Sequence, residues 1–147
     1  VCKVLDLARE LGPIGATQSE EDQERILTAA KALTQFSDEK PARQRLGVSP
    51  GEPPHCLVYS SSPGGSSGQL FGSVHGKVTQ VFNEMKLVNA VELGPLKISL
   101  QADLTVKDDW NNKVAFKQTA VSLFGQTVVE KTMKGGGLWK YLFAGVV

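Results

Sequence analysis

The sequence predicts a mainly β protein, an antiparallel β-barrel preceded by two short α-helices. Three observations lead to this fold class. Apolar residues recur at helical spacing near the start, the period changes to two after Pro54, and strand-like segments then follow at short intervals. The 147 residues suit one domain with a helical appendage. We therefore divide the chain into a helical lead (1–40), a linker rich in proline and glycine (41–54) and a barrel (55–147).

The helical lead is expected to contain two amphipathic helices. The first carries apolar residues at helical spacing and ends before Gly12-Pro13; they are Val4, Leu5, Ala8 and Leu11. Ser19 is a suitable N-cap for the second, because acidic residues crowd the turn that follows it. Its apolar stripe comprises Ile26, Ala30, Leu33 and Phe36, and Pro41 ends the segment. We expect both helices to pack on the barrel; a membrane-surface helix is less favoured because the polar face is acidic.

Eight strand candidates make up the rest of the chain: His55–Ser60, 69–74, 76–83, 86–93, 95–106, 112–121, 125–133 and 138–146. The clearest is 95–106, where six apolar residues from Leu96 to Val106 alternate with polar ones. The polar segment 108–112 is the turn after it. Short connections favour a closed meander over a sandwich, and a barrel of this size is filled by side chains or holds one small ligand.

Composition and motifs exclude several functions. A net charge of +1 does not indicate nucleic acid as a partner, and no apolar run reaches the roughly 20 residues of a membrane span. The chain contains no H-E-x-x-H motif. Its two G-x-S-x-G sequences, at 47–51 and 64–68, lie in the linker and in a flexible glycine-rich stretch, and neither leads from a predicted strand into a predicted helix. The stretch at 64–68 also lacks the ending of a phosphate-binding loop. Asp108-Asp109 is interpreted as a solvated turn rather than a cation site. We therefore predict no enzyme activity and no required cofactor.

Two amides interrupt the apolar faces of the predicted strands. Gln80 and Asn89 share their faces with Val78, Phe82, Leu87 and Val91. A buried amide without a partner costs roughly 1–3 kcal/mol, so both should face inward on adjacent strands and find partners. They bond either to each other and the backbone, or to the polar end of a mostly apolar ligand.

Six short motifs follow in order along residues 55–141: LVYS from Leu57, SPG from Ser62, GKVTQVF from Gly76, VNAV from Val88 with LGPL from Leu93, LFG from Leu123, and GLWKY from Gly137. In this respect the chain resembles the plastid lipid-associated proteins, or plastid fibrillins. The resemblance implies a lipocalin-like barrel in chloroplasts, at thylakoids, plastoglobules or in the stroma. It also implies that the protein binds or carries an apolar molecule such as a lipid, quinone or carotenoid.

The expected ligand contacts are side chains facing the barrel interior: Tyr59, Val78, Gln80, Phe82, Leu87, Asn89, Val91, Ile98, Leu100, Phe116, Trp139 and Tyr141. Two departures from the family stand out. His55 occupies the usual place of a tryptophan, and the chain reaches Val147 without the family's acidic residue, arginine and final strand. The barrel then either lacks its last strand or is completed by a partner chain.

The alternative function is therefore a structural subunit docked on a thylakoid membrane complex, with peripheral membrane association. Outward lysines would face acidic protein or anionic lipid: Lys77, Lys86, Lys97, Lys107, Lys113 and Lys117. A lipocalin-like enzyme, the third hypothesis, would need an acid or base in the pocket. The glutamates of residues 55–147 are only Glu84, Glu92 and Glu130, and Glu92 falls on an outward phase.

Overall fold

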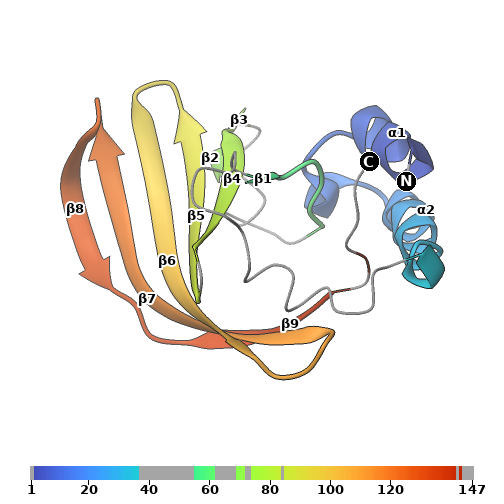
Figure 1. The fold of residues 1–147 in the computed structure, drawn as a ribbon. Helices are drawn as coiled ribbons and strands as arrows, with labels where there is room; N and C mark the ends of the chain where they lie inside the picture. Colours follow the sequence, from blue (N-terminus) through green and yellow to red (C-terminus); the bar gives the residue numbers. More distant parts are fainter. Residues whose placement is uncertain are drawn as a thin grey trace.

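The computed structural model describes residues 2–36, 55–61, 69–71, 74–83, 85–141 and 143. It shows two helices beside a curved antiparallel sheet, so the mainly β class with two leading helices is confirmed (Figure 1). The predicted linker at 41–54 and the whole of the glycine-rich loop at 62–68 lie outside the described residues.

Helices α1 (Cys2–Leu11) and α2 (Glu20–Lys31) begin and end near the predicted signals, with short 3-10 turns at Gly15–Thr17 and Thr34–Phe36. The Ser19 hydroxyl accepts a hydrogen bond from the Asp22 amide at 3.2 Å, which confirms the N-cap. The second apolar stripe is shorter than predicted. Because α2 ends at Lys31, Phe36 is not part of the helix and does not lie on its apolar face; the side chain is 69% exposed.

Seven strands form the main sheet: β1 (His55–Cys56), β4 (Lys77–Asn83), β5 (Lys86–Leu93), β6 (Leu96–Val106), β7 (Asn111–Leu123), β8 (Gln126–Thr132) and β9 (Gly136–Lys140). Their order is β1-β4-β5-β6-β7-β8, and β9 also pairs with β7. The bounds of β4 to β8 differ from the predicted ones by at most two residues. The segment predicted as one strand at 69–74 is instead a separate pair, β2 (Gln69–Phe71) and β3 (Val74–His75).

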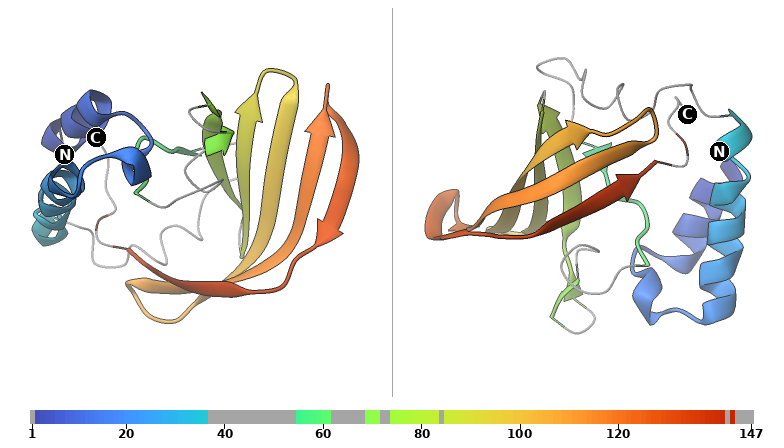
Figure 2. Two further views of the ribbon diagram at one scale, coloured as in Figure 1. Left: turned by 180° about the vertical axis from the view of Figure 1, so that it is seen from behind. Right: turned by 90° about the horizontal axis from the view of Figure 1, so that it is seen from below.

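Strand β7 is long enough to pair with two strands at one edge. Its second half pairs with β8, whereas Asn111–Ala115 pairs with β9. A register shift opposite Gln101 and Ala102 gives β7 an extra residue, and such bulges bend a strand. Gly136 permits the close approach of β9, since a Cβ there would lie 2.0 Å from the Val114 carbonyl oxygen. As a result β9 turns under the sheet toward the helices (Figure 2).

The sheet is curved but open in the part of the chain that the structure describes. β1 and β8 lie at opposite ends of the strand order, and no pairing joins them there. Closure into a barrel therefore stays a prediction.

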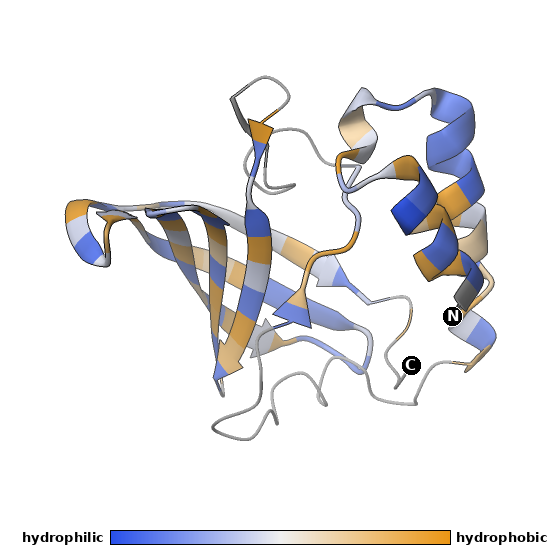
Figure 3. Cartoon of the chain, turned by 90° about the horizontal axis from the view of Figure 1, so that it is seen from above, coloured by the Kyte–Doolittle hydropathy of each residue, from blue (hydrophilic) through white to orange (hydrophobic). Residues whose placement is uncertain are grey.

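The concave face, defined by Val78, Gln80 and Phe82, carries the core of the sheet. The pairs Val78–Val91, Gln80–Asn89 and Phe82–Leu87 face each other across β4 and β5, as the alternation predicts. Hydrophobic and hydrophilic residues alternate along the strands of the sheet in Figure 3. At one end, which we call the closed end, five buried side chains pack together: Phe82, Leu87, Ala102, Leu104 and Val114. Phe116 and Trp139 cover this cluster.

All six predicted outward lysines are exposed, and Lys97 and Lys117 form ion pairs with Glu92 and Asp103 at 3.0 and 3.1 Å.

Candidate functional site

The chain between β1 and residue 61 leaves the sheet and meets the turn between the helices. The Gly15 amide donates to the Ser60 carbonyl at 2.7 Å, and the Ser60 amide donates to the Pro13 carbonyl at 3.0 Å. These bonds make a parallel bridge between Ile14 and Ser60. They explain why the strand predicted at His55–Ser60 stops at Cys56. Beyond Leu57, which still donates to the Val78 carbonyl at 3.0 Å, the backbone bonds to the helical lead instead of β4.

Tyr59 completes this junction, which we call the clasp. Its hydroxyl donates to the Gln18 Oε1 at 3.2 Å. The Tyr59 ring packs directly over Gly15. A Cβ at residue 15 would lie only 2.2 Å from the Tyr59 hydroxyl, so there is no room for a side chain. Burial raises the pKa of Tyr59, and the negative charge of Asp22 raises it further. The clasp thus needs a glycine at residue 15 and a neutral phenol at residue 59.

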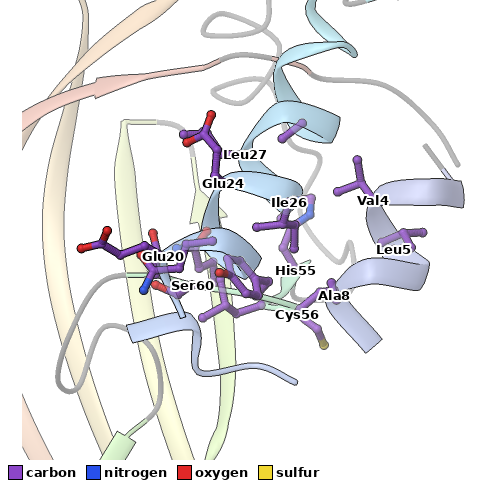
Figure 4. A pocket seen from close by; sticks show the side chains of 17 residues that line it. Val4, Leu5, Ala8, Glu20, Glu24, Ile26, Leu27, His55, Cys56 and Ser60 are labelled. Carbon is purple, nitrogen blue, oxygen red and sulfur yellow. The ribbon is translucent and has the colours of Figure 1, made fainter. Parts of the chain in front are cut away.

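A cavity of about 740 Å³, the helix cleft, lies between the helix pair and the first strand. Its walls are the inner faces of α1 and α2, together with the segment 55–61 (Figure 4). Most of the side chains on the helix side are apolar: Val4, Leu5, Ala8, Ile26, Leu27 and Ala30. Ala8 and Ile26 are 3% and 5% exposed, whereas Leu27 is 40% exposed, so the helices leave the cleft open on one side. The apolar stripes of the two helices therefore line a cavity rather than a filled core.

Polar groups of the helix cleft come from two sides. On the sheet side, Tyr59 and Gln80 line it together with His55, whose ring meets Phe82 edge-on at 5.5 Å. On the helix side, Glu20 and Glu24 extend from α2 (Figure 4). None of the described residues that line the cleft is a lysine or an arginine. The site is thus apolar, with a few neutral polar groups at the sheet and carboxylates at the helix.

The two interior amides do not satisfy each other. Gln80 and Asn89 are direct cross-strand partners on the concave face, as predicted. However, the Asn89 Oδ1 is buried and has no hydrogen-bond partner in the described part of the chain, so the Gln80 amide does not donate to it. An acceptor left in this way costs roughly 1–3 kcal/mol. Mutual hydrogen bonding of the two amides therefore does not account for the Asn89 oxygen, which can still accept a hydrogen bond.

The twelve predicted ligand contacts divide into three groups. Tyr59 and Gln80 line the helix cleft. Val78, Phe82, Leu87 and Val91 are buried on the concave face, and Asn89, Ile98, Leu100, Phe116 and Trp139 are partly buried there. Tyr141 follows β9, and its hydroxyl accepts a hydrogen bond from the Asn112 amide at 3.2 Å.

From the sequence, no residue of the two helices was assigned to a binding site. The apolar stripes of the helices were the signal that could have identified the residues lining the cleft. An apolar stripe shows which helix face is turned inward, but not how closely that face meets its neighbour.

Other chemistry is not visible in the described residues. No group of three histidine, cysteine or acidic side chains there could hold a metal ion. No described helix combines the length and the apolar character that crossing a membrane requires.

Comparisons with family models, with curated proteins and with solved structures found no match to this chain. The likeness to plastid fibrillins therefore rests on the six sequence motifs alone.

Proposed function

We propose that this protein is a non-catalytic binding protein for an apolar small molecule, which it holds in the helix cleft. The observation that carries the proposal is the cavity of about 740 Å³ between the helix pair and the sheet. Small-molecule sites typically enclose about 300–1,000 Å³, and they combine an apolar lining with a few polar groups that orient the ligand. The cleft has this composition.

Binding would be passive. Each Å² of apolar surface that leaves water contributes roughly 25 cal/mol to the free energy of binding. Leu27, which lines the cleft and is 40% exposed, supplies such surface. In the described residues the clasp holds the helix pair at one end, through the contacts of Tyr59 and Ser60 with the turn between the helices. A ligand between helices and sheet would add the packing that the two parts lack without it.

The resemblance to plastid fibrillins supports the same class of ligand and adds a location. On that basis the cargo is a lipid, quinone or carotenoid, and the protein works in chloroplasts at thylakoids or plastoglobules, or in the stroma. These assignments depend on the motifs, whereas the binding proposal depends on the cleft.

Filling the cleft tests the proposal. Ala30→Trp places an indole in the cavity, so binding of an apolar fluorescent probe should fall at least roughly tenfold, a loss of about 1.4 kcal/mol. Ala32→Trp is the matched control, because Ala32 is exposed at the end of α2 and does not line the cleft. Undiminished binding by a folded Ala30→Trp variant would show that the ligand lies elsewhere.

A second function, docking on a larger assembly, is favoured by strand β8. Every residue of β8 is exposed, including Val128 at 59% and Val129 at 58%, and the neighbouring Phe124 is 80% exposed. In the described residues β8 pairs only with β7, so its other edge is open to a strand from a partner protein.

Native mass spectrometry of protein purified from its source separates the two functions, because it would show a bound small molecule, a bound protein or both. If docking uses the β8 edge, Val129→Lys should abolish the protein complex and leave the small molecule in place, since lysine on an edge strand opposes strand pairing. Retention of the partner by this variant would exclude the β8 edge.

A further inference from the structure

We infer that the ligand of the helix cleft is an uncharged amphiphile whose polar end carries a hydrogen-bond donor, such as a hydroxyl group. This inference rests on the proposed function and narrows the class of ligand. Two independent observations carry it: the charges around the cleft and the unsatisfied amide oxygen beside it.

The charges oppose an anionic ligand. Glu20 and Glu24 line the cleft, and Asp22 is close enough to raise the pKa of Tyr59. Arg25, the arginine of α2, forms ion pairs with Asp22 at 2.9 Å and with Glu10 at 3.5 Å. A carboxylate in the cleft would therefore lose water without gaining a counterion, and it would face like charges. A fatty acid, although its chain suits the apolar lining, is disfavoured by its head.

The amide pair specifies what the polar end should be. Gln80 lines the cleft, and Asn89 lies directly across from it on β5. The Cβ atoms of such a pair lie about 4.5–5.5 Å apart, so Asn89 adjoins the cleft wall at Gln80 although it is not itself among the lining residues. The Asn89 Oδ1 is buried and has no donor in the described part of the chain. A hydroxyl would donate to this oxygen, whereas an ester or a carboxylate offers only acceptors.

A cationic head is also disfavoured at this end of the cleft. The amides are neutral, and the carboxylates of Glu20 and Glu24 are on exposed residues of the opposite wall. Glu20 and Glu24 would attract an ammonium group, but attraction between exposed charges is weak and does not offset the cost of desolvating that group beside Gln80. A neutral donor satisfies the amide oxygen without that cost.

Four probes with the same twelve-carbon chain test the inference: dodecanol, methyl dodecanoate, dodecanoate and dodecylammonium, measured by calorimetry at neutral pH. Dodecanol should bind at least roughly tenfold more tightly than each of the others, a difference of about 1.4 kcal/mol. The discrimination against dodecanoate should narrow with added salt, because exposed charges are screened beyond about 10 Å at 0.1 M.

Variants assign the effect to residues. Asn89→Leu should reduce dodecanol binding several-fold and leave methyl dodecanoate unchanged, while thermal stability stays equal or rises because an unsatisfied acceptor is removed. Gln80→Leu provides a second test if Asn89→Leu does not fold. Glu20→Gln should improve dodecanoate binding, and Glu21→Gln is its matched control, since both are exposed in the first turn of α2 but only Glu20 lines the cleft.

The outcomes separate this inference from the proposed function. Dodecanoate or dodecylammonium binding as tightly as dodecanol would overturn the uncharged ligand, and an equally tight methyl ester would overturn the donor. In those cases the cleft still binds apolar molecules. Failure of all four probes to bind would overturn the proposed function and this inference together.

Discussion

The closed end of the sheet and the helix cleft are both lined by aliphatic side chains, yet they differ in how completely those side chains meet. At the closed end Leu104 and Val114 are each 1% exposed, and Trp139 of β9 covers the cluster. Among the described residues that line the helix cleft, only Ala8 and Ile26 are buried, and about 740 Å³ stays open. The closed end is assembled by strand pairing, which sets neighbouring side chains side by side, whereas in the described residues the helix pair is joined to the segment after β1 by hydrogen bonds at the turn between the helices.

This difference assigns separate roles to the two regions. A dense core resists change because each methylene already has neighbours, so the closed end gives the protein its stability. A loosely filled cleft can gain contacts from a ligand, so under the proposed function the helix pair supplies the binding surface. Substitutions in the two regions should therefore have different effects, and four predictions test this from the largest effect to the smallest.

The largest loss of stability is expected at the closed end. Leu104→Ala removes a side chain that is 1% exposed, so the free energy of unfolding should fall by about 2–5 kcal/mol in urea denaturation. Leu138→Ala in β9 is the control; Leu138 is 64% exposed, and its truncation should change stability by less than about 0.5 kcal/mol. Equal effects at the two sites would contradict the assignment of the core.

The second effect concerns the clasp. Gly15→Ala forces its new methyl group against the Tyr59 hydroxyl, 2.2 Å away, and should cost about 1–3 kcal/mol in thermal unfolding. The cost should shrink in a Tyr59→Ala background, as a double-mutant cycle would show. Gly137→Ala should be tolerated, because a Cβ there meets nothing within 4 Å. A cost that persists without the Tyr59 ring would place the strain elsewhere.

A smaller effect is expected at the start of α2. Ser19→Ala removes the acceptor for the Asp22 amide and should destabilise α2 by about 1 kcal/mol. Hydrogen exchange should accelerate in α2 and remain slow in β6, since the sheet does not depend on the cap. Ser19→Asn keeps a side-chain acceptor and should restore protection; faster exchange in β6 as well would mean that the two regions unfold together.

The smallest effect is a pH dependence at the clasp. Burial raises the pKa of Tyr59 above its ordinary value of about 10, so the phenol ionises more readily in the unfolded chain. The stability contributed by Tyr59 is therefore complete below about pH 10 and is lost as the pH rises through the higher pKa of the folded state. Urea denaturation between neutral and alkaline pH should show this decline, and Tyr59→Phe should flatten it. An unchanged slope in the variant would assign the decline to other groups.

Local rules account for the elements that were predicted correctly. The Gly12-Pro13 stop and the Ser19 cap act within one or two turns of chain, so they could be identified without knowledge of the fold. The alternation from Leu96 to Val106 likewise defines one strand and its buried face. The facing of Gln80 and Asn89 follows from the short hairpin that joins β4 to β5.

The sequence by itself thus determined the helices, most strands and the side chains that face inward, because these depend on neighbouring residues and on the burial of apolar surface. The tertiary structure alone decided three further features. Strand β1 ends at Cys56 because the backbone beyond it bonds to the turn between the helices. Strand β9 pairs with the first part of β7, which the bulge in β7 bends away from the part that pairs with β8. The helix cleft depends on how the helix pair sits beside the sheet, to which the clasp at Tyr59 and Ser60 joins it in the described residues, and no hydrophobic pattern encodes that arrangement.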